Sequence, residues 1–374
     1  MTITALYVDA RAAEEPEAVA MISRLGLPVR TVTSADEVYA AVAAADDPVR
    51  KGKQVLYLTR NKGAFIKPCP GTGHYTCCGY QILHIGSFCS MDCAYCILQA
   101  YFHPPVLQYF VNHADMVQEL DRAFGQPRIQ RIGTGEFTDS LIWEPWAELS
   151  RKLIPRFGRQ DRAVLELKTK TTHVGALKPL SHNRKTILAW SLNTEQVIRS
   201  EERGTASLEA RLRSAAEAAE AGYPVAFHFD PIVIYEGCEP DYRSVVQRLF
   251  AAVRPERVVW ISLGAFRFMP DLKPLIQKRF PQSKLVYGEF ITGLDGKMRY
   301  FKPLRMQLFR GMAAAIRETA PEACVYLCME DDEVWQDALG FRPADRGGLA
   351  RMLDEAAVRH CGLKGLLTTS SVLG

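Results

Sequence analysis

The stretch SFCSMDCAYC, residues 87–96, decides the fold and places Cys89, Cys93 and Cys96 at the spacing Cys-x3-Cys-x2-Cys. Three thiolates can bind three of the four irons of a [4Fe-4S] cluster. A ferredoxin supplies its fourth cysteine nearby, whereas the residues that follow here, ILQAYFHPP, contain none. The spacing therefore predicts a cluster whose fourth iron has no protein ligand.

An iron without a protein ligand can chelate the amino and carboxylate groups of S-adenosylmethionine (SAM). One electron from the cluster then splits the sulfonium C–S bond and yields a 5′-deoxyadenosyl radical. A zinc site and a fully ligated cluster are the alternatives for these cysteines. The spacing, the aromatic Tyr95 before the last cysteine and the strand before the motif resemble the radical SAM superfamily and favour the open cluster.

Composition narrows the class of protein around this motif. The chain has 374 residues, 48% hydrophobic and 24% charged, which is enough for a large buried core. Its net charge of +4 permits a polyanionic partner without requiring one. It has no apolar run long enough to span a membrane and no signal-like N-terminus, which predicts a cytoplasmic protein. In that compartment the ten cysteines indicate metal or redox chemistry rather than disulfides.

Strands and helices alternate through most of the chain. We predict strands, apolar on both faces as buried parallel strands are, at 80–87, 128–134, 163–169, 186–192, 224–230 and 257–263. Helped by the cysteine motif, this alternation predicts an α/β fold, a radical SAM partial (β/α)6 barrel. The predicted boundaries are an N-terminal α/β domain at 1–66, a cysteine-containing linker at 67–79, the barrel at 80–283, and a C-terminal hairpin and helical extension at 284–374.

Polar residues at the predicted strand ends form a candidate SAM site. Gly135 and Glu136 follow the second strand, Lys170 ends the third, and Ser191 and Asn193 end the fourth. Parallel barrels place their chemistry at these C-terminal ends. Glu136 resembles the superfamily residue that receives the SAM amino group, and we expect Lys170 to pair with the SAM carboxylate. Ser191 and Asn193 are expected to hold the ribose or methionine end; capping or solvated polar residues are the alternative.

Several segments between about residues 79 and 329 resemble spore photoproduct lyase and its relatives. They are CAYCILQAYF (93–102), IQRIGTGEFTDS (129–140), LKTKTTHV (167–174), SLNTEQVIRSEERGTASLEARL (191–212), AGYPVAFHFDPIVIYEG (221–237) and LGAFRF (263–268). The resemblance implies a radical enzyme, a carbon–carbon lyase, that reverses the methylene bridge between two thymines in DNA. It implies DNA as a partner, and such chemistry needs an electron donor such as flavodoxin or ferredoxin.

Two positions depart from the hydrogen-donor relay of that family. The lyase has a donor cysteine just before a Thr-Ser-Asp stretch, where this chain has Glu136, and a tyrosine directly after the last cluster cysteine, where this chain has Ile97. A carboxylate cannot donate a hydrogen atom to a carbon radical as a thiol can. Tyr95 and Cys238, which follows the fifth predicted strand, are the candidate substitutes; for Cys238 the alternative is a small buried thiol. A third route is return of the hydrogen atom by 5′-deoxyadenosine, which regenerates SAM.

Five of the six remaining cysteines lie in two short segments, with Cys69, Cys77 and Cys78 in the first and Cys324 and Cys328 in the second. They predict a second metal site or a redox dithiol, with structural thiols as the alternative. The adjacent pair Cys77-Cys78 is awkward for a single tetrahedral site. Because the first three precede the strand 80–87, we expect them at the end of the barrel opposite the cluster.

A hairpin is predicted within 284–302 around Asp295-Gly296, followed by a helix at 303–319, a strand at 323–329 and a helix at 349–360. In the family a hairpin hereabouts wedges into the duplex. We therefore expect its cations to contact phosphate and its aromatic residue to replace a lost stacking partner. These residues are Lys297, Arg299, Tyr300, Lys302 and Arg305. An ordinary basic surface hairpin is the alternative.

Three functions follow from these observations. The first is repair of a damaged pyrimidine pair in DNA by a radical SAM reaction of the spore photoproduct lyase type. The second is a radical SAM reaction on a modified nucleoside, a peptide or a metabolite, which the missing donor cysteine favours. The third is a non-catalytic iron–sulfur protein for electron transfer or sensing, against which the complete set of SAM residues argues.

Overall fold

The computed structural model describes residues 2–71 and 73–364. Its N-terminal part forms a five-stranded sheet of order β2-β1-β3-β8-β6, in which only β6 is antiparallel to its neighbour. The strands are β1 (Ala5–Asp9), β2 (Val29–Val32), β3 (Val55–Thr59), β6 (Gly86–Ser87) and β8 (Leu107–Phe110), and the helices beside them are α1 (Pro16–Leu25), α2 (Ala35–Ala43) and α3 (Pro48–Gly52). Alternate residues of β1 and β3 enter two separate apolar clusters, one on each face, so this sheet is covered on both sides.

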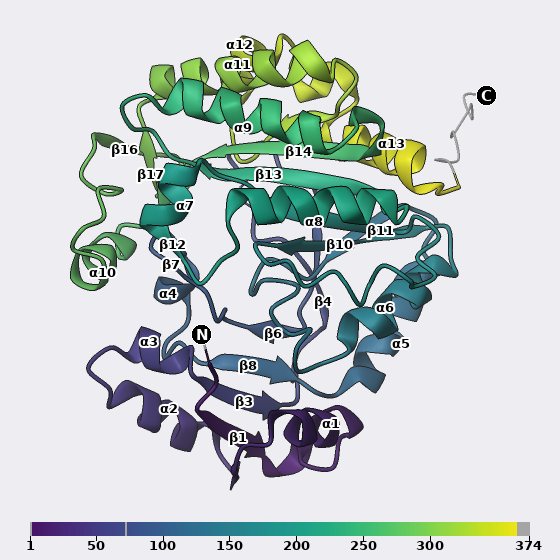
Figure 1. Cartoon of the computed structure of the whole chain (residues 1–374), viewed down its shortest axis with the longest axis vertical. Coiled ribbons are helices and arrows are strands. Elements are labelled where there is room, and N and C mark those ends of the chain that lie inside the picture. The colour runs from purple at the N-terminus through teal and green to yellow at the C-terminus, as the bar shows by residue number, and fades with distance from the viewer. Residues whose placement is uncertain (1, 72, 365–374) are drawn as a thin grey trace.

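The second sheet forms the barrel. Its order is β18-β14-β13-β11-β10-β9-β5-β4, and every neighbouring pair is parallel except β4 with β5. The strands are β4 (Ile66–Pro68), β5 (Gln81–Leu83), β9 (Gln130–Gly133), β10 (Ala163–Thr169), β11 (Thr186–Ser191), β13 (Val225–Ile232), β14 (Val258–Ala265) and β18 (Val325–Leu327). Since β4 and β18 end the sheet without pairing to each other, it curls into an open half-barrel (Figure 1). The predicted α/β partial barrel is confirmed.

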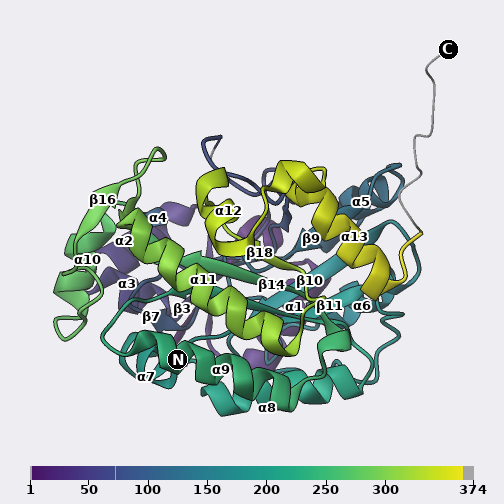
Figure 2. The same ribbon diagram turned by 90° about the horizontal axis from the view of Figure 1, so that it is seen from above.

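Amphipathic helices cover the outside of the barrel sheet (Figures 1 and 2). They are α5 (His113–Phe124), α6 (Leu149–Gly158), α8 (Leu208–Glu220), α9 (Cys238–Ala252) and α11 (Lys302–Thr319). In α8, Leu208, Leu212 and Ala215 recur at helical spacing and are buried, and the Ser207 hydroxyl caps the first turn by accepting from the Ala210 amide. Short elements join them: β7 (Asp92–Cys93), α4 (Leu98–Tyr101), α7 (Glu195–Glu201) and β12 (Glu202–Arg203).

The predicted strand 80–87 is two strands that belong to different sheets. Its first part is β5 of the barrel, whereas its last part, β6, pairs with β8 of the N-terminal sheet. The crossing requires close contact between backbones, because a Cβ on Gly86 would lie 2.5 Å from the carbonyl oxygen of Gln108. The cysteine loop that follows is thereby placed between the two sheets.

The C-terminal part contains the predicted hairpin, β16 (Phe290–Thr292) with β17 (Met298–Tyr300), and β17 also pairs with β15 (Arg267–Phe268). The hairpin and α10 (Leu272–Arg279) project at one end of the molecule (Figure 2). The predicted helices and strand that follow are confirmed as α11, β18 and α13 (Leu349–Cys361), with α12 (Asp332–Leu339) added before α13. Among the described residues, none of the helices combines the length and the apolar character that crossing a bilayer requires.

Candidate active site

The three cysteines of the motif lie close together in the loop between the sheets. Cys89 and Cys93 are buried, and Cys96 is half-buried. Burial raises the pKa of Cys89 to about 12, and the nearby Cys96 sulfur adds to this rise. The pKa of Cys93 is raised by burial and, among other charges, by the sulfurs of both neighbours. Each thiol of the motif therefore lies within electrostatic reach of the others.

Two lysines favour the thiolate forms that bind iron. Lys53 is buried, and its Nζ donates hydrogen bonds to the carbonyl oxygens of Cys89, at 3.1 Å, and Met91, at 2.5 Å. The Lys53 charge offsets part of the rise in the pKa of Cys89, and Lys170 does the same for Cys93. An anionic cluster in this loop would thus be stabilised by two cations.

The arrangement suits a cluster better than a zinc ion. Across residues 2–71 and 73–364, no three His, Cys, Asp or Glu side chains converge on a point that could hold one metal ion. Zinc needs its four ligands roughly 2.0–2.3 Å from a single point. In an iron–sulfur cluster each thiolate binds a different iron, so the thiols need not converge. Cys89, Cys93 and Cys96 fit a [4Fe-4S] cluster in this respect.

A buried ion pair holds the cysteine loop against the barrel. Arg211 of α8 and Glu202 of β12 form a pair in which neither side chain is more than 1% exposed. β12 pairs with β7, which places Glu202 opposite Cys93. The Tyr95 hydroxyl donates to the same carboxylate, and the Lys170 Nζ lies 5.8 Å from the centre of the Tyr95 ring. Tyr95 is therefore anchored beside the cluster cysteines.

The charges of this network are balanced inside the protein. Burial by itself would raise the pKa of Glu202, but Arg211 and Lys170 keep it below its ordinary value. Arg211 also donates to the backbone carbonyls of Ser191 and Ala206, both at 2.9 Å. Ser191, one of the predicted SAM residues, is thus tied through its backbone to the anchor of the cysteine loop.

Gly135 and Glu136 lie at the end of β9, as predicted. Residue 135 must be glycine, because a Cβ there would lie 2.9 Å from the Lys168 Cβ and 3.2 Å from the Ser140 Oγ. Lys168 lies inside the barrel, where burial would lower its pKa, but Glu136 and other anions raise it. Glu136 therefore lies within electrostatic reach of this partly buried ammonium group at the mouth of the barrel.

Lys170 and Asn193 have different surroundings. The backbone amide of Lys170 donates to the Asp139 carboxylate at 2.7 Å, and its side chain extends toward Tyr95. The Asn193 amide group instead joins neighbouring elements, since it donates to the Pro231 carbonyl and accepts from the Tyr242 hydroxyl at 2.8 and 2.7 Å. A direct contact between Asn193 and SAM therefore remains a prediction.

Four of the five additional cysteines line one small cavity of about 30 Å³ together with Tyr75, Tyr326 and Leu349; they are Cys69, Cys77, Cys78 and Cys328. The segment between β4 and β5 folds across the open side of the barrel to reach the end of β18, where the Thr76 amide donates to the Glu330 carbonyl at 3.2 Å. We expected the first three thiols at the end of the barrel opposite the cluster. The Cys69 amide donates to the Tyr80 carbonyl just before β5, and Arg131 near the start of β9 donates to the Cys78 carbonyl, so both residues are tied to that end of the sheet, while the segment between them crosses the gap toward β18.

The sulfurs around this cavity differ in protonation. Cys78 donates to the Cys77 sulfur, which lowers the pKa of Cys77 to about 5. Burial raises the pKa of Cys69 to about 12, and it does the same for Cys328. Cys324 does not join them: it precedes β18 and lines a different groove with Arg351 and Arg359.

Cys238, the predicted substitute donor, is buried at the first turn of α9. Burial raises the pKa of its thiol, and the acidic side chains that add to this effect, Glu239 and Asp241, belong to its own helix. The structure does not bring Cys238 to Glu136 or to the four-thiol cavity.

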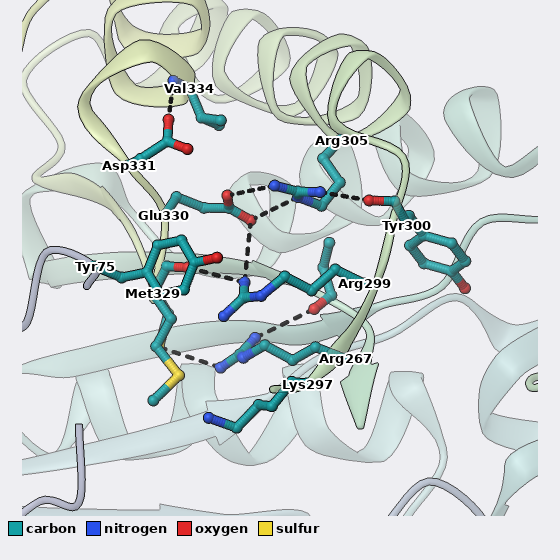
Figure 3. Close-up of polar contacts among 12 residues, drawn as sticks. Tyr75, Arg267, Lys297, Arg299, Tyr300, Arg305, Met329, Glu330, Asp331 and Val334 are labelled. Atoms are coloured by element: carbon teal, nitrogen blue, oxygen red, sulfur yellow. Dashed lines mark hydrogen bonds and ion pairs between the residues drawn. The ribbon is translucent and has the colours of Figure 1, made fainter. Parts of the chain in front are cut away.

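The hairpin cations were predicted to face outward, toward phosphate, but they are paired with acidic side chains of the protein. Figure 3 shows Arg267, Arg299 and Arg305 packed between the hairpin and the segment after β18. Arg299 and Lys297 pair with Asp295 at 2.8 Å, and Arg305 pairs with Glu330 at 3.0 Å. Tyr300 is buried too, and Lys302 pairs with Asp331 and Glu333. Acidic side chains of the hairpin and of the segment after β18, which the prediction did not consider, form ion pairs with these cations.

Sequence reasoning missed the residues that support the site, namely Lys53, Lys168, Glu202, Arg211, Asp230 and Arg267. Arg211 carried a signal, because it lies within the apolar stripe of α8 beside Leu208 and Leu212, where a charged side chain requires a buried partner. Lys53 carried none, since its partners are carbonyl groups far along the chain.

An open parallel half-barrel with a three-cysteine loop and polar strand ends at one mouth defines a radical SAM protein. A family model described as spore photoproduct lyase matches residues 4–317. The chain belongs to the spore photoproduct lyase family. It is 28% identical to spore photoproduct lyase of Bacillus subtilis over 294 residues, 76% of this chain and 84% of that protein. It is 25% identical to the Clostridium acetobutylicum protein over 255 residues, 67% of this chain and 72% of that protein.

Solved structures agree on the fold. Spore photoproduct lyase complexed with dinucleoside spore photoproduct aligns with a TM-score of 0.74 at 23% identity, over 87% of this chain and 99% of that one. A mutant with bound AdoMet and dinucleoside spore photoproduct aligns with a TM-score of 0.77 at 24% identity, with the same coverage.

Proposed function

We propose that this protein is a radical SAM lyase that repairs a damaged pyrimidine pair in DNA, with the spore photoproduct as the first candidate substrate. The observation that carries the proposal is the position of the cysteine loop beside Tyr95 and Lys170, near the mouth of the half-barrel where Glu136 lies. Family membership supports it, as do the structural neighbours that bind AdoMet and dinucleoside spore photoproduct.

The residues of the chain have distinct tasks in this proposal. Cys89, Cys93 and Cys96 would hold the [4Fe-4S] cluster, which supplies the electron that cleaves SAM. Glu136 and Lys170 would bind the amino and carboxylate groups of SAM, while the Gly135 backbone allows close approach. Both charged groups lie in a partly buried mouth, where electrostatic contacts are stronger than in water.

Apolar side chains of the hairpin are the proposed contact with DNA. Leu294 at its tip is 72% exposed, Ile291 is 44% exposed and Phe301, just after it, is 53% exposed. Apolar side chains can wedge between base steps and unstack them. A pyrimidine lesion must leave the base stack before it can enter the barrel, so such a wedge would help to extrude it.

The electron donor, a flavodoxin or ferredoxin in this proposal, can approach the cysteine loop from the surface. A cleft of about 460 Å³ is lined by Arg50, Ser90, Asp92, Arg203 and Arg279. Ser90 directly follows the cluster ligand Cys89, so a bound donor would lie near the cluster. Cytoplasmic localisation belongs to the same proposal because such donors and DNA are found together there.

Lesion repair is the test of the proposed function. DNA oligonucleotides that carry the methylene-bridged thymine lesion, the cyclobutane dimer or the 6–4 product are incubated with reconstituted protein, SAM and reductant. We expect thymine release from at least one of them, measured by mass spectrometry. Release from none, with SAM cleavage intact but not stimulated by DNA, would favour a modified nucleoside, a peptide or a metabolite as substrate.

A second metal site at Cys69, Cys77, Cys78, Cys324 and Cys328 is the competing proposal for these thiols. Four of them line one cavity and Cys324 lines a different groove, so the side chains would have to rearrange to bind one ion. This proposal predicts that iron or zinc persists when Cys89, Cys93 and Cys96 are all replaced by alanine, because the remaining thiols are untouched. Metal analysis of the folded triple variant decides this. Metal-free protein would show that these cysteines are structural thiols and not metal ligands.

A further inference from the structure

The proposed lyase reaction needs a hydrogen-atom donor, and this inference rests on that reaction. In that reaction a 5′-deoxyadenosyl radical from SAM would take a hydrogen atom from the lesion, and cleavage of the bridging C–C bond would then leave a carbon radical on one thymine. That radical needs one hydrogen atom to become a normal base. Glu136 cannot provide it, because its O–H bond is too strong, whereas the S–H bond of a thiol is weak enough.

One thiol is built into the same mouth of the barrel as Glu136. Cys328 directly follows β18, and its backbone amide donates to the Leu263 carbonyl of β14 at 2.8 Å, which fixes it at the C-terminal strand ends. Its Sγ accepts a hydrogen bond from the Arg267 Nη2 at 3.4 Å. Arg267 in turn pairs with Asp230 from β13 at 3.2 Å.

The charged side chains near Cys328 come from the strand ends at the mouth of the barrel. Burial raises the pKa of its thiol, and the nearby Asp230 and Glu136 add to the rise, while Arg267 and Lys168 oppose it. Burial opposes ionisation of Asp230, yet Arg267 and a hydrogen bond from Cys328 help to lower its pKa. Cys328 therefore carries its hydrogen at neutral pH and lies within electrostatic reach of Glu136.

The other candidate donors are placed less well. Cys238 is buried at the start of α9, where its charged and polar neighbours are side chains of its own helix together with Tyr235 and Tyr300. The hydroxyl of Tyr95 is engaged with Glu202 beside the cluster. Cys69 is also influenced by Glu136, but its backbone is tied to the edge of the barrel sheet through the Tyr80 carbonyl at 2.9 Å.

We propose that Cys328 is the catalytic residue that returns the hydrogen atom to the thymine radical. The S–H bond of Cys328 breaks, a C–H bond forms on the thymine methyl group, and a thiyl radical remains on Cys328. One electron from the reductant that also reduces the cluster, together with one proton from water, restores the thiol. SAM is consumed in this sequence, so one 5′-deoxyadenosine forms for each lesion repaired.

Isotope transfer tests the assignment. The S–H hydrogen exchanges with solvent, so repair in D2O should place one deuterium in the methyl group of the released thymine. In Cys328→Ala, substrate-dependent 5′-deoxyadenosine formation should persist, while thymine release and its deuterium label are lost and radical adducts accumulate. Cys238→Ala and Cys361→Ala, which remove buried thiols elsewhere in the fold, are matched controls that should keep both. Unlabelled thymine from the wild-type protein, or normal labelled release by Cys328→Ala, would overturn the inference.

A binding measurement needs no cluster. In the protein without iron, the dinucleoside lesion should slow alkylation of Cys328 by iodoacetamide and leave that of Cys324 unchanged, as peptide mass spectrometry would report. Equal protection or none at Cys328 would place its thiol outside the substrate site. Absence of repair by the wild-type protein would overturn the proposed function and this inference with it, whereas the outcomes for Cys328→Ala concern the inference alone.

Discussion

Replacement of Cys93 by alanine is expected to abolish both the [4Fe-4S] cluster and SAM cleavage. The cluster has only three protein ligands in this loop, and loss of one would leave two irons without protein ligands, so the cluster would not be retained. The wild-type protein, reconstituted anaerobically and reduced, should cleave SAM to methionine and 5′-deoxyadenosine. The measurements are iron content, the visible absorption of the cluster and chromatography of 5′-deoxyadenosine.

Cys361→Ala is the matched control for this experiment. Cys361 is as fully buried as the cluster cysteines, but it lies at the end of α13 with its backbone carbonyl bonded to Lys185. The same substitution there removes a buried sulfur and should leave iron content and SAM cleavage unchanged. Full iron and full SAM cleavage in the Cys93→Ala protein would disprove the radical SAM assignment.

Arg211→Met is expected to destabilise the protein by roughly 3–5 kcal/mol, because it leaves the buried Glu202 carboxylate without its partner. The two side chains are 0% and 1% exposed, so water cannot replace the lost contact. The backbone carbonyls of Ser191 and Ala206 lose their donor as well. Urea unfolding of the protein without iron measures the loss in the free energy of unfolding.

The same variant should bind iron poorly, since Glu202 positions β12 against the strand that contains Cys93. Arg248→Met on α9 is the matched control, because it breaks pairs with Glu195 and Glu209 that lie at the surface. Exposed pairs contribute about 0–1 kcal/mol, so this control should be nearly as stable as the wild type. A similar, small loss in both variants would show that the buried pair does not anchor the cysteine loop.

The local pattern of the chain was sufficient to predict the barrel strands and the position of the cysteine loop. The apolar strands at 163–169 and 186–192 match β10 and β11 almost residue for residue, because strands buried on both faces have a composition that does not depend on distant partners. The spacing of Cys89, Cys93 and Cys96 likewise predicts the proposed cluster ligands, since consecutive ligands in one loop are a local property.

Tertiary structure alone decided which charges and thiols meet at the barrel mouth. The hairpin cations were predicted to contact phosphate, but Arg305 is buried against Glu330, an acid 25 residues further along the chain that no local pattern links to it. Cys69 and Cys328 are separated by most of the chain, and they meet because the segment after β4 crosses the gap that an open sheet leaves. The closure of such a gap depends on long-range packing. The sequence by itself therefore predicts the cluster ligands, and the fold decides which thiols and charges gather at the barrel mouth.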